Sequence, residues 1–135
     1  MKEKPIDSIL SYARHCFTSF DELPFNVIDA TICCQMAYLF IEENFENNFS
    51  DQGMPVWQLL RAEQFTEMCR ALPAEQELTD MIFAFAASPR YRGVRIKYCR
   101  NELDPSISLQ FSGVVYSFSD TLHFIGFRGT DKSMV

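Results

Sequence analysis

Apolar side chains in the first third of the chain recur at helical spacing. The i, i+3, i+4, i+7 pattern of an amphipathic helix begins near the N-terminus, at Ile6, Ile9, Leu10, Ala13 and Phe17. A second helix is predicted over residues 26–42, directly after Pro24. Its apolar side chains are spread nearly all round the helix, which is typical of a helix that is buried on most sides.

Two further helical segments follow a polar stretch. Residues 43–55 are rich in Asn, Asp and Glu and contain glycine and proline, so they are predicted to form a loop that Phe45 and Phe49 hold in place. Helical patterning returns over residues 56–72 and again over residues 78–88. The chain is therefore expected to contain four helices before its first strand.

In the last third of the chain the periodicity changes from helical to alternating. Val94, Ile96 and Tyr98 are predicted to share one face of a half-exposed strand near a sheet edge. Two more alternating segments, residues 109–118 and 122–127, are separated by a short polar turn. This spacing predicts a β-hairpin.

The last of these strands carries apolar side chains on both faces. Leu122 and Phe124 face one way and Ile125 and Phe127 the other, so the strand requires cover on both sides. The helices can cover one face, and few residues follow the strand. We therefore expect this sequence to be the front part of a larger domain. We also expect self-association as a two-fold dimer that either pairs the strands ending near Phe127 or packs their bare faces together. The alternative is a compact monomer in which the 43–55 loop and the first helix cover that face.

Length and charge narrow the class of protein. The 135 residues fit a single domain, 1–135, of α/β class, with N-terminal helices over about 5–88 and a short antiparallel β-meander over about 94–128. The net charge of −6 argues against a nucleic-acid partner, because phosphate binding requires a basic surface. No apolar run reaches the roughly 18 residues of a membrane span, and the N-terminus lacks the apolar core of a signal peptide. We expect a cytoplasmic protein without a membrane span.

Cysteine and histidine positions give no sign of a metal or redox site. The chain has five cysteines and two histidines, without the C-x-x-C spacing of a zinc site or the even count of a disulfide framework. We expect no cofactor and no metal, and reduced thiols at Cys33 and Cys34. His15 and Cys16 are neighbours on a predicted helix and do not face each other, so they are not a nucleophile–base pair. His123 is interpreted as a hydrogen-bonded structural histidine.

Two groups of charged side chains stand out along the chain as possible binding sites. The basic group fits either a site for an anion or acidic partner or the charged decoration of an edge strand; it consists of Arg90, Arg92, Arg95, Lys97 and Arg100. The acidic group lacks the alternating oxygen ligands of a calcium loop and is interpreted as a solvated loop; it consists of Glu42, Glu43, Glu46 and Asp51.

Several segments resemble a known family. The run Phe127-Arg128-Gly129-Thr130-Asp131 resembles the F-R-G-[ST] segment of class 3 lipases. The other matching segments are Pro24 to Asp29 leading to Ala37-Tyr38-Leu39, then Asn101-Glu102-Leu103-Asp104, then Gln110-Phe111-Ser112-Gly113-Val114. In this order they resemble the start of a bacterial family of unknown function among the lipase-like α/β-hydrolases. The resemblance covers nearly all of this chain but only the front part of the family's domain, and Val27 stands where members usually carry an acidic residue.

The resemblance implies an α/β-hydrolase fold and, in the complete enzyme, ester hydrolysis through an acyl-serine with an ester or lipid substrate. It assigns Thr130 to the oxyanion hole, where a hydroxyl and a backbone N–H stabilise developing negative charge. Gly129, which has no Cβ, lets the backbone approach. The alternative interpretation of this segment is a strand-ending turn, since glycine and aspartate are common in turns.

The nucleophile that such an enzyme requires is not found in this sequence. A nucleophile elbow has the pattern G-x-S-x-G, and none of the five glycines brackets a serine at that spacing. We therefore expect this chain alone to be inactive. The alternative function is a non-enzymatic interaction or oligomerisation module on a degenerate hydrolase scaffold.

Overall fold

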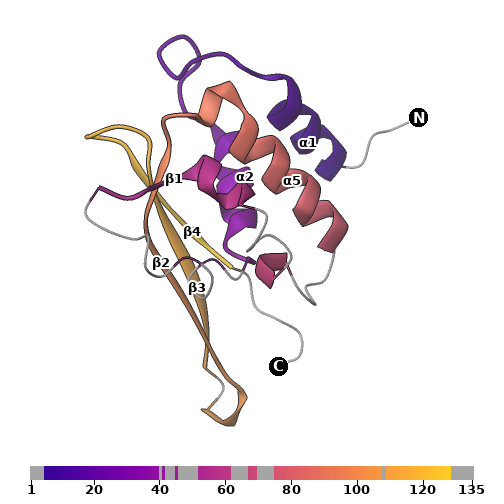
Figure 1. Ribbon diagram of the computed structural model, residues 1–135, viewed down its shortest axis with the longest axis vertical. Helices are drawn as coiled ribbons and strands as arrows, with labels where there is room; N and C mark the ends of the chain where they lie inside the picture. Colours follow the sequence, from indigo (N-terminus) through magenta and orange to yellow (C-terminus); the bar gives the residue numbers. More distant parts are fainter. Residues whose placement is uncertain are drawn as a thin grey trace.

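The computed structural model describes residues 5–39, 41, 45, 52–61, 67–69, 75–107 and 109–128. Over these residues helices pack on one face of a four-stranded antiparallel sheet of order β1-β2-β3-β4 (Figure 1). The α-helices are α1 (Pro5–His15), α2 (Val27–Met36) and α5 (Glu75–Ala87). The strands are β1 (Met54–Pro55), β2 (Arg95–Asp104), β3 (Leu109–Ser117) and β4 (His123–Phe127). Short 3-10 helices cover Val56–Leu60, Pro89–Tyr91 and Pro105–Ile107. The predicted mixed α/β class is confirmed.

No helix in the described part of the chain is both long enough and apolar enough to cross a membrane.

Helix α2 is the central element of the helical layer. It contacts α1 and α5 as well as β3 and β4, and α1 and α5 lie beyond it on the side away from the sheet (Figure 1). Ile32, Cys33 and Met36 are fully buried, as predicted for a helix covered on most sides. Val27 is 77% exposed at its first turn, so the cover does not extend to the start of the helix.

The carboxyl end of α2 is held by the sheet. The helix ends at Met36, well before residue 42, and two of the hydroxyls of β3 reach its last turn. The Ser112 hydroxyl donates to the carbonyl of Ala37 at 2.6 Å and the Tyr116 hydroxyl to the carbonyl of Cys33 at 3.2 Å. A helix end leaves its final carbonyls without intrahelical partners. Here the backbone N–H groups of the turn after α2 bond the carbonyls of residues 34–36, and β3 supplies partners for the two carbonyls on either side.

Strand β2 does not alternate regularly. Its register with β3 shifts between Ile96 and Tyr98, which is the mark of a β-bulge. Val94 and Ile96 are buried, whereas Tyr98 is 57% exposed. The prediction that these three side chains share one face is therefore wrong, because the bulge reverses the faces of the residues that follow it. The predicted β3–β4 hairpin is confirmed, with Val115 opposite Ile125.

The end of the predicted 43–55 loop and the segment after it differ from expectation. Met54–Pro55 pairs with the start of β2 as the short strand β1. The next residues form a 3-10 helix that ends at the extended residue Arg61, so the predicted 56–72 helix does not begin as an α-helix. The N–H of Val56 donates to the carbonyl of Val94 at 3.1 Å. This segment is thus bonded to β2 at the position where an α-helix was expected to start.

The core lies between the helices and the sheet. Its largest fully buried side chains include Tyr91, Tyr116, Phe45, Phe85, Ile32, Met36, Leu39 and Ile41. Phe45 is buried, as predicted, but it is helical and does not lie in a loop, whereas Phe49 lies outside the described residues.

Gly126 allows α2 to approach β4 closely. A Cβ at Gly126 would lie 3.0 Å from the carbonyl oxygen of Cys33 and 3.2 Å from the Cα of Cys34. Both contacts are with helix backbone, which cannot rotate away as a flexible side chain could. The spacing of the helix layer and the sheet therefore depends on a glycine at this position.

We expect Gly126→Ala to lower the free energy of unfolding by about 1 to 3 kcal/mol, because the added methyl group overpacks a tight contact. Gly93→Ala is the matched control, since a Cβ there meets no atom within 4 Å. Urea denaturation of both variants measures the effect. Equal stability of the two variants would show that α2 moves away from β4 without cost.

Candidate functional site

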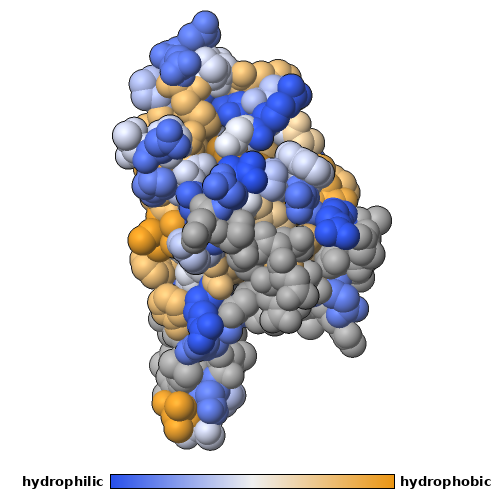
Figure 2. All heavy atoms as spheres, turned by 60° about the vertical axis from the view of Figure 1, so that its left-hand side comes forward, coloured by the Kyte–Doolittle hydropathy of each residue, from blue (hydrophilic) through white to orange (hydrophobic). Residues whose placement is uncertain are grey.

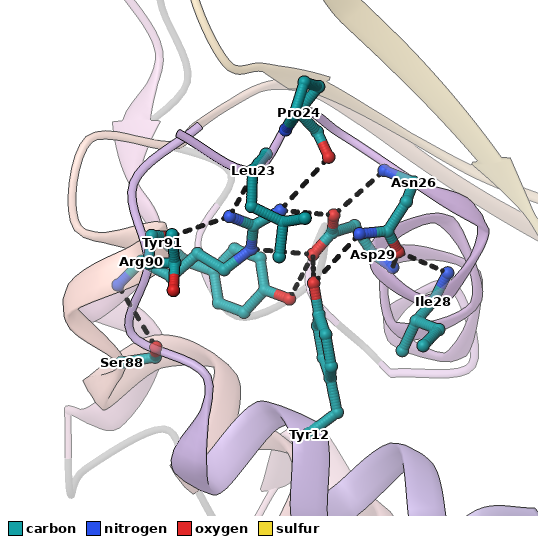
Figure 3. A network of polar contacts seen from close by, with 10 residues as sticks. Tyr12, Leu23, Pro24, Asn26, Ile28, Asp29, Ser88, Arg90 and Tyr91 are labelled. Carbon is teal, nitrogen blue, oxygen red and sulfur yellow. Dashed lines mark hydrogen bonds and ion pairs between the residues drawn. The ribbon is translucent and has the colours of Figure 1, made fainter. Parts of the chain in front are cut away.

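A buried polar network joins α1, the loop before α2, α2 itself and the 3-10 helix Pro89–Tyr91 (Figure 3). At its centre the Arg90 guanidinium lies 2.7 Å from the Asp29 carboxylate, and neither side chain is exposed. The two residues are 61 positions apart in the chain. The ion pair therefore connects segments that local sequence patterns do not relate.

The five N–H groups of the Arg90 side chain find acceptors around them. Nε donates to Oδ1 of Asp29 at 3.1 Å and Nη2 to Oδ2 at 2.7 Å, so the carboxylate is bound by two parallel hydrogen bonds. Nη1 donates to the carbonyls of Thr18 and Leu23, and Nη2 also reaches the carbonyl of Pro24 at 3.5 Å. The guanidinium also lies 4.1 Å from the ring centroid of Phe20, a cation–π contact. One side chain thus fixes the loop before α2.

Asp29 is equally well supplied with donors. It receives the Tyr91 hydroxyl at 2.6 Å, the backbone N–H of Asn26 at 3.0 Å and the Tyr12 hydroxyl at 3.4 Å. Burial alone raises the pKa of Asp29, but the hydrogen bonds from Arg90 and Tyr91 outweigh it and the pKa is lowered. The carboxylate is therefore charged at neutral pH. Burial, and then the hydrogen bond to Asp29, raise the pKa of Tyr91, so its phenol stays protonated.

The network also begins helix α2. The Asn26 side-chain oxygen accepts from the N–H of Ile28 at 2.9 Å and from the N–H of Asp29 at 3.4 Å. The Asp29 carboxylate in turn accepts from the N–H of Asn26, and this reciprocal pair of bonds between Asn26 and Asp29 is a capping box. The spacing Asn26-x-x-Asp29 is the sequence signal that could have predicted this helix start. Nothing local indicated Arg90, which was grouped with surface basic residues and is instead a buried ion-pair partner, so that part of the basic-group interpretation is wrong.

Each donor and acceptor described in this network has a partner inside the fold, and neither charged group is exposed to solvent. A catalytic acid or base must reach a substrate. The network therefore stabilises the junction of these segments and is not an active site.

A second feature is the face of the sheet turned away from the described helices, here called the open face. Its apolar side chains are Tyr98, Phe111, Val115, Ile125 and Phe127, and they line a shallow groove. Tyr98, Ile125 and Phe127 are each more than half exposed. Figure 2, which brings the sheet side of the molecule forward, shows apolar surface there beside hydrophilic side chains. The prediction of apolar residues on both faces of the last strand is confirmed, because Ile125 and Phe127 lie on the open face and Phe124 packs against the core on the opposite face.

Gly113 shapes the open face. The rings of Phe111 and Phe127 meet edge to face with centroids 5.9 Å apart, and a Cβ at Gly113 would lie 3.2 Å from the ring of Phe111. At the border of the face Arg100 and Glu102 form an exposed ion pair of 2.8 Å. The open face thus combines an aromatic surface with one basic and one acidic side chain.

The residues that sequence analysis assigned to chemistry are not brought together. Thr130, the expected oxyanion residue, lies outside the described residues, as does Gly129. His15 is exposed at the end of α1, as predicted for a surface residue, and His123 is exposed on β4. The exposure of His123 does not support its interpretation as a hydrogen-bonded structural histidine.

The remaining charged and sulfur-containing candidates separate in the same way. Arg95 donates to the carbonyls of Gln52 and Gly53, and Arg100 pairs with Glu102, so the basic group does not converge on one site. The acidic group predicted as a solvated loop lies outside the described residues. None of the five cysteines of the chain forms a disulfide bond. Among the described residues no three His, Cys, Asp or Glu side chains cluster as metal ligands.

Comparison with protein families matches residues 85–135 to a family described as Mbeg1-like. The match begins within α5, continues through β2, β3 and β4, and includes the F-R-G-T segment. No curated protein and no solved structure shows significant similarity to this chain.

We expect Asp29→Asn to lower the free energy of unfolding at pH 7 by about 3 to 5 kcal/mol, because it leaves the Arg90 charge buried without its counter-charge. The Asp29 pKa is lowered on folding, so the stability that the carboxylate contributes is fully present above its ordinary value of 3.8 and is lost as the pH falls further. The difference in free energy of unfolding between the unmodified protein and the variant should therefore shrink below that pH.

Denaturant titrations of both proteins from pH 7 to pH 2 measure this difference. Tyr91→Phe, which removes one hydroxyl donor and no charge, is the matched control and should cost about 1 to 3 kcal/mol. A difference in free energy of unfolding that stays constant down to pH 2 would contradict the assignment of the negative charge to Asp29.

Proposed function

We propose that this chain forms the front part of a lipase-like serine hydrolase domain that cleaves carboxylic esters, with Thr130 as an oxyanion donor. The observation that carries the proposal is the meeting of three lipase-like segments at Ser112. The Ser112 hydroxyl donates to Ala37 at 2.6 Å, and its carbonyl accepts the N–H of Arg128 at 3.0 Å. Segments scattered along the chain thus meet at Ser112, which is bonded to Arg128 in the described part of the F-R-G-T run.

The chemistry follows from the residue types in that run. Acyl transfer places negative charge on the substrate carbonyl oxygen, and removing one preorganised donor to that oxygen costs about 3 to 4 kcal/mol of transition-state stabilisation. Thr130 offers a hydroxyl and a backbone N–H, and Gly129 before it has no Cβ to obstruct a substrate. The serine nucleophile and its base are expected in sequence that this chain does not contain, because its 135 residues include no G-x-S-x-G.

We expect no turnover of short-chain nitrophenyl esters by this polypeptide. In a form extended to a nucleophile serine, Thr130→Ala should lower kcat/KM by up to about 10² to 10³, the cost of one oxyanion donor. Thr121→Ala, in the exposed turn before β4, is the control and should leave the rate unchanged. Turnover by the present chain, or full activity of the Thr130 variant, would exclude the assigned role.

A second candidate function, an interaction module, is favoured by the open face. Its apolar side chains are more than half exposed on β2 and β4, on either side of β3, and exposed apolar patches of this kind mark association surfaces. We take the occupant to be a second copy of this chain, because Arg100 and Glu102 lie side by side at the border of the face. In a two-fold arrangement each copy would offer its basic residue to the partner's acidic one.

We expect a dimer whose mass, measured by light scattering over a dilution series, falls toward 15.6 kDa only at low concentration. Phe127→Asp should shift the equilibrium to the monomer, because it places a charge in the apolar contact. Phe83→Asp is the matched control, since Phe83 on α5 is 52% exposed and Phe127 is 56% exposed. A monomer at every concentration, or equal effects of the two variants, would remove the open face as the interface.

A further inference from the structure

Arg128 continues the β3–β4 pairing by one residue. Its N–H donates to the carbonyl of Ser112 at 3.0 Å, in register with the pairing of Gly113 and Phe127. Phe127 lies on the open face and Gly126 faces α2. Because side chains alternate along a strand, Arg128 is on the helix side, next to the residue that holds the carboxyl end of α2.

The side chain of Arg128 is left with buried donors. Its Nε and Nη2 atoms are both buried, and neither has a hydrogen-bond acceptor among the described residues. These two nitrogens lie on the same edge of the guanidinium and present two parallel N–H groups, a spacing that matches the two oxygens of a carboxylate. A buried charged group without a partner is costly. The two unmet donors therefore favour the binding of an anion of that geometry.

Arg90 shows what this edge of a guanidinium binds within the same protein. Its Nε–H donates to Oδ1 of Asp29 at 3.1 Å, and its Nη2–H donates to Oδ2 of the same carboxylate at 2.7 Å. The corresponding edge of Arg128 has no such partner in the described chain. Gln35, in the last turn of α2, also has a buried side-chain oxygen that receives no hydrogen bond among the described residues. A second polar group at this end of the helix therefore lacks a hydrogen-bond partner.

We propose that Arg128 is a carboxylate-binding residue, whose Nε–H and Nη2–H receive the two oxygens of one carboxylate beside the carboxyl end of α2. The carboxylate comes either from a small organic acid or from an acidic side chain. The proposal does not depend on the hydrolase function, because it follows from the geometry of one guanidinium and the burial of its donors.

Side-chain ¹H–¹⁵N NMR of the arginine Nε–H groups tests the proposal on the unmodified protein. Arg90 serves as the internal reference for a carboxylate-bound Nε–H, and the exposed Arg92 as the reference for a solvated one. Sodium formate is titrated at pH 7 against sodium chloride of equal ionic strength. A saturable shift of the Arg128 resonance with formate, together with slower exchange with water, would identify a small organic acid as the source.

An Arg128 Nε–H that is already protected without formate would identify an acidic side chain as the source. That protection should then be lost between about pH 5 and pH 3, where ordinary carboxylates protonate, at a pH where Arg90 in the same spectrum is still protected. An Arg128 resonance that exchanges as fast as that of Arg92 and ignores formate would overturn the proposal. Equal responses to formate and chloride would overturn it as well, because they would show no preference for carboxylate geometry.

Arg128→Lys provides an independent measurement, because lysine keeps the charge but lacks the paired N–H groups. If the source is a small organic acid, formate should raise the Tm of the unmodified protein and not that of the Arg128→Lys variant. If the source is an acidic side chain, the unmodified protein should be more stable than the variant without formate. Arg92→Lys is the matched control and should retain it. If Arg128→Lys does not fold, the NMR titration of the unmodified protein decides the question.

Discussion

The ion pair between Asp29 and Arg90 is the constraint on which the arrangement of the helical layer depends. It joins the start of α2 to the 3-10 helix that follows α5, and its remaining N–H groups hold the loop carbonyls of Thr18 and Leu23. Because that loop also carries Phe25, whose ring packs 4.9 Å from Phe118 and 5.3 Å from Phe124, the pair sets where the loop meets the β3–β4 hairpin. The position of α2 over the sheet follows from these contacts at one end and from Ser112 and Tyr116 at the other.

Much of the secondary structure could be predicted because it depends on local periodicity. The helices α1 and α5 and the β3–β4 hairpin have apolar side chains at regular spacing and clear stop signals, such as Ser88–Pro89 after α5. Elements that depend on a distant partner were missed. Strand β1 exists through its pairing with β2, and the bulge after Ile96 leaves the alternation of the sequence unchanged while reversing the faces of the strand.

Whether a functional residue could be predicted likewise depends on whether its role follows from local sequence or from a distant partner. Thr130 was assigned through a short sequence resemblance, and it lies outside the described residues. The Asp29–Arg90 pair was missed because charge counting treats every arginine in a basic run alike, although Arg90 is buried and Arg92 is exposed. The orphaned donors of Arg128 could be found only in three dimensions, since a missing partner is a property of the surroundings and leaves no trace in composition or spacing.

Ser112 bonds α2 through its side chain and Arg128 through its backbone. Hydrogen bonds of one small residue thereby connect the helical layer to the residue that follows β4. A displacement of the carboxyl end of α2 would pull on Ser112 and shift the first residue after β4, without any side chain in between having to change its rotamer. Substitutions on the buried side of α2 can thereby change the position of the Arg128 backbone.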